Sequence, residues 1–427
     1  VYATGNVLSV AKVSELKGTG SIAYVLENVI NHVAIPNAIN LTDTVSTGQF
    51  GVVAMGRGNG LTVNNISVVG NSNIGVSSTT GKAVINNGTL KVANSIANKT
   101  SIGIYSKGGT ITNKGTVTVG NNSLGIYGEK SSVTTGALTV SGNKGVGISL
   151  NNKAGAIGNV VVNGNVSVGA NQAVGIQVSK ANVTVNNLTV GNGDSKGIYA
   201  DGAGNVTARG NVVVGNDSVG IYQKAGTGIV RVGTANNTMK VGDKGYGVLS
   251  QGSAVINNSN LTVGKEGIGI YGKNTTVNQA GNIKVGETTI GNGGFSNPNK
   301  NKNSIGIFAD NSNVNYTGTM TVDKPLSVGI YAANGGNVTL KNGAVLNIKN
   351  GATGVMTGKG VTAVTVDKGA VINVNGKANH PSASKNNVSF GIAAYSGVID
   401  NKGTINLTNG ATGIYLGGTA KLKNGAT

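Results

Sequence analysis

Tyrosine is the residue type whose spacing points most clearly to a surface function. Seven of the 12 tyrosines stand two positions after a glycine that is followed by isoleucine: Tyr105, Tyr127, Tyr199, Tyr222, Tyr271, Tyr331 and Tyr415. Phe308 occupies the same position after Gly306. Aromatic rings that share an exposed face can bind sugar rings or the apolar side chains of a partner. They can equally stack on one another and stabilise neighbouring strands, and the sequence is compatible with both roles.

Residues able to catalyse a reaction or hold a metal are few and scattered. Neither of the two histidines, His32 and His380, lies in a recognisable motif. Glycan cleavage needs paired carboxylates, whereas the 14 acidic residues fall singly, with several in turns beside lysines: Asp194, Asp217, Asp243 and Glu266. The chain has no cysteine for a thiolate site and lacks the calcium-binding glycine–aspartate repeat. We therefore expect no enzyme activity, no metal and no cofactor.

The glycine that precedes these tyrosines recurs along most of the chain and defines a repeat. It stands at positions 51, 75, 103, 125, 147, 175, 197, 220, 247, 269, 306, 329, 354, 391 and 413, and the basal interval is 22 residues, as from 103 to 125. One repeat holds three short strand patterns, at 102–105, 110–112 and 116–119, separated by turns rich in glycine and asparagine. Three strands in 22 residues make one coil of a parallel β-helix, whose coils stack about 4.8 Å apart. The sequence thus predicts an all-β solenoid of about 15 coils.

The residues around the repeated glycine predict an inner and an outer face. Isoleucine or valine follows it in every repeat, and an apolar residue usually precedes it, as Ile102 and Ile104 flank Gly103. Residues two apart share one face of a strand. We therefore predict that both flanking residues face the core, and that the glycine and the tyrosine face outward.

Asparagine recurs beside the second turn of the coil, at Asn86, Asn113, Asn186, Asn257 and Asn401. Stacked amides can form a ladder between coils. Asparagine is also a common turn residue for its local backbone preference alone, so a ladder and a simple turn role are both possible here.

Composition and charge exclude several classes of protein. Glycine and proline together are 76 of 427 residues, which is below the roughly 25–30% typical of disordered chains. No stretch is long and apolar enough for a membrane helix. The net charge of +19 comes from lysines spread along the chain, which predicts a generally positive surface and no specific nucleic-acid partner.

The ends and two long repeats depart from the regular pattern. Residues 1–45 are less repetitive and are interpreted as a cap or irregular leading segment, with a possible short helix over 22–33, whereas 46–427 form the β-helix. Insertions at about 288–303 and 376–387 are predicted at one corner of the coil, and loops on a rigid scaffold commonly carry function. The candidate ligand-binding residues in these insertions are Phe295, Lys300, Lys302, Lys377, His380 and Lys385. The chain also ends within a repeat, so we expect a fragment of a longer protein.

The coils resemble the passenger domains of type V autotransporters, most of all the giant fusobacterial outer-membrane adhesins. The resemblance covers about residues 46–427 and is clearest in Asn-Asn-Ser-Leu-Gly-Ile-Tyr-Gly (121–128) and Ile-Thr-Asn-Lys-Gly-Thr-Val-Thr-Val-Gly (111–120). It implies a right-handed parallel β-helix at the bacterial surface, tethered to the outer membrane by a C-terminal β-barrel that is not in this sequence. It also implies adhesion to host cells or partner bacteria through a surface glycan or a receptor protein. No binding residue carries over, because the repeats do not mark one.

These observations predict a fragment of a surface adhesin that binds through the exterior of its β-helix. Besides the insertion residues, the candidate ligand-binding residues are Tyr105, Tyr127, Tyr199, Tyr222, Tyr271, Phe308 and Tyr331. The first alternative is a structural stalk that presents a distal binding region. The remote alternative is a β-helical polysaccharide-degrading enzyme.

Overall fold

Strands and turns make up the secondary structure of the described residues. The computed structural model describes residues 1–427 apart from 8, 14–15, 288–302, 377–387 and 424–427. No helix in this described part of the chain could span a membrane. The chain divides into two compact units, Val1–Thr207 and Ala208–Thr427, and every strand pair described below lies within one unit.

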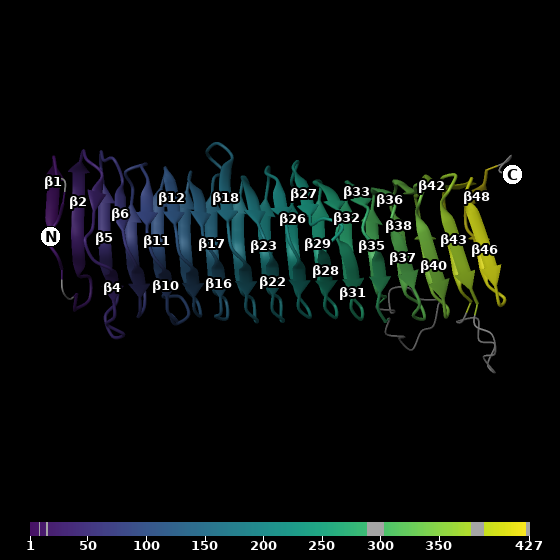
Figure 1. Cartoon of the computed structure of the whole chain (residues 1–427), viewed down its shortest axis with the longest axis horizontal. Coiled ribbons are helices and arrows are strands. Elements are labelled where there is room, and N and C mark those ends of the chain that lie inside the picture. Colours follow the sequence, from purple (N-terminus) through teal and green to yellow (C-terminus); the bar gives the residue numbers. More distant parts are fainter. Residues whose placement is uncertain (8, 14–15, 288–302, 377–387, 424–427) are drawn as a thin grey trace. The chain divides into compact units, whose positions relative to one another are not determined.

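Residues 1–207 form three sheets in which neighbouring strands are parallel and come from successive coils (Figure 1). In spatial order, sheet A contains β1 (Tyr2–Gly5), β2 (Ile22–Val29), β5 (Phe50–Met55), β8 (Ile74–Ser78), β11 (Ile102–Lys107), β14 (Leu124–Glu129), β17 (Val146–Asn151), β20 (Val174–Ser179) and β23 (Lys196–Asp201). Sheet B contains β3 (Val33–Ala34), β6 (Leu61–Val63), β9 (Val84–Asn86), β12 (Thr110–Asn113), β15 (Ser132–Thr135), β18 (Gly158–Val162) and β21 (Ala181–Val185). Sheet C contains β4 (Ile39–Leu41), β7 (Ile66–Val68), β10 (Leu90–Val92), β13 (Val117–Val119), β16 (Leu138–Val140), β19 (Val166–Val168) and β22 (Leu188–Val190).

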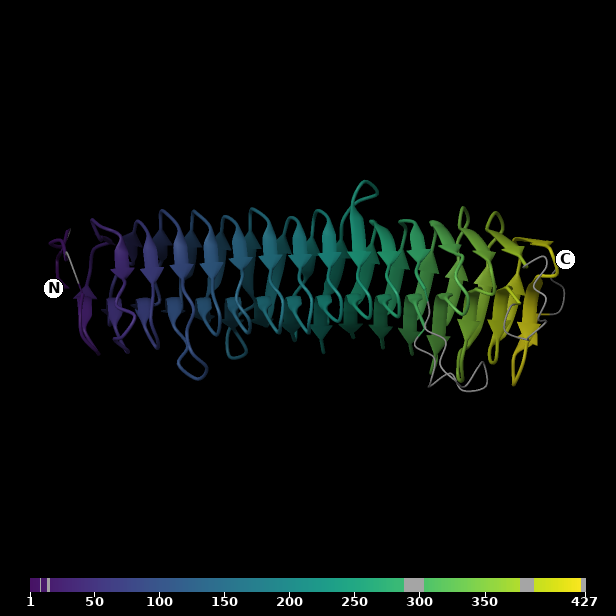
Figure 2. The ribbon, with the colours of Figure 1, turned by 90° about the horizontal axis from the view of Figure 1, so that it is seen from below.

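Residues 208–427 repeat the same arrangement (Figure 2). Strand β24 (Val206–Ala208) lies across the division in the sequence. Sheet A here contains β26 (Val219–Lys224), β29 (Tyr246–Gln251), β32 (Ile268–Lys273), β35 (Ile305–Asp310), β38 (Val328–Ala333), β41 (Thr353–Thr357), β44 (Phe390–Ala394) and β47 (Thr412–Leu416). Sheet B contains β27 (Ile229–Val232), β30 (Ala254–Asn257), β33 (Thr276–Gln279), β36 (Asn313–Tyr316), β39 (Asn337–Leu340), β42 (Ala363–Val366), β45 (Val398–Asn401) and β48 (Lys421–Leu422). Sheet C contains β25 (Val212–Val214), β28 (Thr238–Val241), β31 (Asn260–Val263), β34 (Ile283–Val285), β37 (Thr319–Val322), β40 (Val345–Lys349), β43 (Val371–Asn375) and β46 (Thr404–Thr408).

The strand register confirms the predicted coil. Tyr105 pairs with Tyr127, one basal repeat of 22 residues further along the chain. The third strands bury both of their apolar positions as predicted, since Val117 and Val119 are 0% exposed. Stacking each coil on the next removes these side chains from water without a globular core, and burying one such side chain stabilises the fold by about 1.5–3 kcal/mol.

The predicted helix over 22–33 is wrong, because residues 22–29 form strand β2. Tyr24 pairs with Val52 and Leu26 with Ala54, so β2 is hydrogen-bonded to the first strand of the next coil. Its apolar residues do recur at helical spacing, but a free sheet edge beside them supplies hydrogen bonds that outweigh a local propensity. With β3 and β4 pairing in the same way, residues 22–41 form a coil of their own.

The predicted orientation of the repeated glycine is also wrong, because it faces inward. A Cβ built on Gly103 would lie 2.5 Å from Leu90 Cδ1 and 2.6 Å from the carbonyl oxygen of Gly125. Ile104 faces the core as well, at 0% exposure, and Ile102 is left half-exposed on the outer face. Two consecutive inward residues interrupt the strand alternation, as at a bulge, and only glycine leaves room for the side chains of sheet C.

Three of the five asparagines beside the second turn take part in a buried amide ladder. Asn86, Asn113 and Asn257 are at most 1% exposed. Asn86 Nδ2 donates to Asn113 Oδ1 at 2.6 Å, and Asn257 Nδ2 donates to Gln279 Oε1 at 2.7 Å, one coil further in each case. The ladder interpretation is therefore confirmed at these positions.

The other two asparagines lie outside the buried ladder. Asn186 Nδ2 donates to the backbone carbonyl of Asn163, one coil earlier. Asn401 Oδ1 accepts from the backbone N–H of Gly403 at 3.3 Å. Both are half-exposed. The local contact of Asn401 fits the simple turn role, whereas Asn186 bonds a backbone carbonyl of the preceding coil and forms no amide–amide ladder.

Candidate binding surface

The seven aromatic candidates lie on the outer face of sheet A. Tyr105, Tyr127 and Tyr199 belong to β11, β14 and β23 in residues 1–207. In residues 208–427, the corresponding column of outward side chains runs in register through Tyr222, Leu249, Tyr271, Phe308, Tyr331 and Met356. We call these six residues of 208–427 the aromatic column. All of its members are half-exposed.

Neighbouring rings on sheet A contact one another. Tyr105 and Tyr127 stack with centroids 5.6 Å apart and an interplanar angle of 29°. Phe308 touches Tyr271 edge-on and Tyr331 at a tilt, with both centroids 5.0 Å away. These contacts are the ladder that the sequence offered as one role for the tyrosines. They cover part of each ring, and all five rings remain half-exposed.

A second outward column was missed by the sequence analysis. Val219 and Ile268, apolar residues immediately before the repeated glycine that were expected in the core, are half-exposed, as is Tyr246 at the same position. Further along, Ile305 and Val328 are only 8% and 3% exposed. The sequence did carry a signal for this orientation, because glycine occupies its position in every repeat. A residue without a Cβ is needed where the chain comes close to a packed core. The outer face of sheet A is consequently more apolar than predicted.

A polar cluster lies where the aromatic column meets the turn into sheet B. The Tyr271 hydroxyl donates to Asp310 Oδ2 at 2.9 Å, and Lys273 Nζ lies 3.6 Å from the same oxygen. Asn334 Nδ2 donates to Asp310 Oδ1 at 2.9 Å. Burial opposes ionisation of Asp310, but the hydrogen bonds from Asn334 and Tyr271 and the charge of Lys273 outweigh it and lower the pKa of the carboxyl.

The ionisation of Tyr271 tests this cluster. Burial, its hydrogen bond to Asp310 and the negative charge of that carboxylate together raise the pKa of Tyr271 to about 12. We expect the ultraviolet titration difference between the wild type and Tyr271→Phe to show this late ionisation, and Asp310→Asn to move it to lower pH. Circular dichroism over the same pH range provides the control for unfolding. A Tyr271 that titrates near the ordinary value of about 10 would contradict the described contact.

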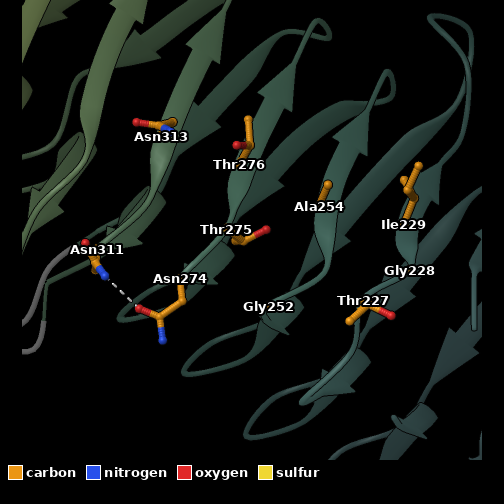
Figure 3. Close-up of a pocket in the computed structure, with 10 residues that line it drawn as sticks. All are labelled: Thr227, Gly228, Ile229, Gly252, Ala254, Asn274, Thr275, Thr276, Asn311 and Asn313. Atoms are coloured by element: carbon orange, nitrogen blue, oxygen red, sulfur yellow. Dashed lines mark hydrogen bonds between the residues drawn. The ribbon is translucent and has the colours of Figure 1, made fainter. Parts of the chain in front are cut away.

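A groove crosses four coils of residues 208–427 on the neighbouring face (Figure 3). Its volume is about 580 Å³. One row of lining residues consists of the first residues of four sheet B strands: Ile229, Ala254, Thr276 and Asn313. The other row comes from the preceding turns and includes Thr227, Gly252, Asn274 and Asn311. None of the ten lining residues is titratable.

One of the coils that line the groove has very small side chains. Gly252 and Ala254 present at most a methyl group between the larger side chains of the coils on either side. Gly252 has φ +91°, and a Cβ there would lie 2.7 Å from the carbonyl oxygen of Gly226. Only glycine adopts this conformation without strain, so the backbone itself keeps the floor of the groove open.

The remaining residues singled out in the sequence lie either outside the described residues or in tight turns. Phe295, Lys300, Lys302, Lys377, His380 and Lys385 lie outside the described residues. The acidic residues before the repeated glycines occupy tight turns, and Asp194, Asp217 and Glu266 have positive φ angles. Over the described residues, no three His, Asp or Glu side chains converge as a metal site would require.

The comparisons with known proteins bear on the fold. The family model described as "Right handed beta helix region" matches residues 124–290. No curated protein and no solved structure matches the chain. Together with the parallel pairing within the three sheets, the match confirms the predicted fold class, a right-handed parallel β-helix.

Proposed function

We propose that this chain is part of a bacterial surface adhesin, an autotransporter passenger that binds host cells or partner bacteria. The observation that carries the proposal is the outer face of sheet A in residues 208–427. There the aromatic column runs beside the half-exposed Val219, Tyr246 and Ile268. A soluble surface seldom arranges apolar side chains in adjoining columns unless another molecule contacts them.

Its partner is a glycan or receptor protein on another cell, and the chain acts by binding and not by catalysis. The lining of the groove supports this, because its threonine, asparagine, isoleucine, alanine and glycine residues offer hydrogen bonds and apolar contacts but no general acid or base. The resemblance of the repeats to fusobacterial adhesins supports a location at the cell surface.

A stalk is the second candidate function, and the ring contacts favour it. Tyr105 with Tyr127, and Phe308 with its two neighbours, are arranged as a stabilising ladder would be. A stalk needs a regular, stable exterior and no affinity of its own. The two functions therefore differ in one measurable property, which is binding by this chain in isolation.

The test is saturable binding of the purified chain to intact cells. The chain has no cysteine, so Thr262→Cys, on an exposed position of sheet C, provides a single site for a fluorescent label. We expect saturable binding to at least one bacterial or mammalian cell type in a panel, displaced by unlabelled chain. Binding that survives 1 M salt is expected of the apolar columns, because the Debye length falls to about 3 Å there. Unsaturable or absent binding on every cell type would support the stalk.

A further inference from the structure

We propose that the groove of residues 208–427 binds a linear chain of neutral sugars. This inference rests on the proposed adhesive function and names the ligand chemistry of one site within it. The groove runs across strands, so its long direction follows the stacking of the coils at about 4.8 Å per coil. A ligand that lies along it therefore meets the same kinds of side chain at regular intervals.

The polar lining is uncharged and held in place. Asn311 Nδ2 donates to Asn274 Oδ1 at 2.9 Å (Figure 3). Asn313 Oδ1 accepts from the backbone N–H of Asn337 at 3.0 Å and from Asn337 Nδ2 at 3.2 Å. With these oxygens bonded within the protein, the amide nitrogens of Asn274 and Asn313 are oriented as hydrogen-bond donors.

The groove also offers acceptors and an apolar floor. The Thr275 hydroxyl donates to the Ser253 carbonyl at 2.7 Å, which leaves its oxygen lone pairs as acceptors. Ile229 and Ala254 supply the apolar contacts between the polar walls. A sugar ring presents hydroxyl groups around its rim and C–H groups on its face, so it matches such a mixture of contacts.

Other ligand classes match the groove less well. An ionic ligand would be left without a counter-charge, because no lining residue is titratable. An extended peptide usually binds by adding a strand to a sheet edge. Here the strands that line the groove are already paired on both sides, as Ala254 is flanked by Ile229 and by the coil of Thr276.

The test uses the full chain and two matched tryptophan variants. Ala254→Trp fills the groove floor, whereas Ala363→Trp places the same bulk at the equivalent first position of β42, outside the groove. Both positions are half-exposed and face outward. The probes are linear neutral oligosaccharides of hexoses and N-acetylhexosamines, measured by calorimetry, with sulfated and sialylated oligosaccharides for comparison.

We expect the wild type to bind at least one neutral oligosaccharide with little loss at 1 M salt. Ala254→Trp should weaken that binding at least tenfold, and Ala363→Trp should leave it unchanged. Asn274→Ala, a smaller change at the wall, should also weaken it and guards against a folding defect in the tryptophan variant. The proposal is overturned if no neutral oligosaccharide binds, if only charged ones bind, or if Ala254→Trp binds as well as the wild type.

Cell binding by the same variants separates this proposal from the adhesive function. If the wild type and Ala254→Trp bind cells equally, the adhesive function stands and the groove is not its sugar site. If the wild type binds a neutral oligosaccharide but no cells, the groove proposal stands and the adhesive function fails.

Discussion

Gly125→Ala is expected to lower the free energy of unfolding of residues 1–207 by about 3 kcal/mol, the upper range for overpacking a close-packed core. The added Cβ would lie 2.5 Å from the carbonyl oxygen of Gly147 and 2.8 Å from Val117 Cγ1. Val117 is 0% exposed and cannot move into solvent. The backbone of the next coil would have to shift instead, which disturbs the stacking on both sides. Urea unfolding by circular dichroism, with amide hydrogen exchange in β11, β14 and β17, measures the effect.

Gly155→Ala is the matched control. The closest atoms to its added Cβ would belong to the flexible side chain of Lys130, with Cγ at 3.2 Å, and the Asn152 carbonyl oxygen at 3.8 Å is at ordinary contact distance. We expect a change within about 0.5 kcal/mol there. If the two variants unfold at the same urea concentration, the repeated glycine does not face the core and the outward columns are misassigned.

Asn113→Asp is expected to lower the free energy of unfolding by about 3–5 kcal/mol near neutral pH, the cost of a buried charge without a partner. Asn113 is 1% exposed. Its Nδ2 donates to the carbonyl of Gly115 at 2.7 Å and to Thr135 Oγ1 at 3.1 Å. A carboxylate cannot donate, and it would face the Gly115 carbonyl oxygen with a negative charge. Urea midpoints of the variant and the wild type measure the loss.

The pH dependence identifies the charge as the cause. Burial raises the pKa of such a carboxyl in the folded state, so the loss grows as pH rises from the unfolded pKa of about 3.9 toward the folded one. The gap between variant and wild type should therefore be smaller near pH 4 than near pH 7. Asn87→Asp, at the exposed position that follows Asn86 on the preceding coil, should change little at either pH. A loss that is the same at both pH values would indicate that hydrogen bonds alone are responsible.

The repeat made the fold predictable from sequence. The basal 22-residue period, the isoleucine or valine after each repeated glycine and the paired apolar residues of the third strand are properties of a single coil that recur along the chain. Stacking identical coils multiplies a weak local signal, since each residue type meets its equivalent one coil away. The parallel pairing of Tyr105 with Tyr127 follows directly from that period.

The remaining features depend on contacts that one coil does not reveal. The inward turn of Gly103 is set by Leu90 of sheet C, which strict alternation along one strand ignores. Strand β2 replaces the expected helix because β5 offers it a sheet edge. The groove arises from the difference between Ala254 and its larger neighbours on adjoining coils, and a pattern that averages over repeats conceals such a difference.

Cell binding after one site is blocked shows directly whether the outer face of sheet A in residues 208–427 makes the contact. Leu249 lies in the aromatic column between Tyr222 and Tyr271, and Thr262 is exposed on sheet C. Two variants are made, each with one of these residues replaced by cysteine, and the introduced cysteine is coupled to a bulky polyethylene glycol maleimide. We expect at least tenfold weaker cell binding for the conjugate at Leu249→Cys and unchanged binding for the conjugate at Thr262→Cys. Equal binding by the two conjugates would contradict a contact through the outer face of sheet A.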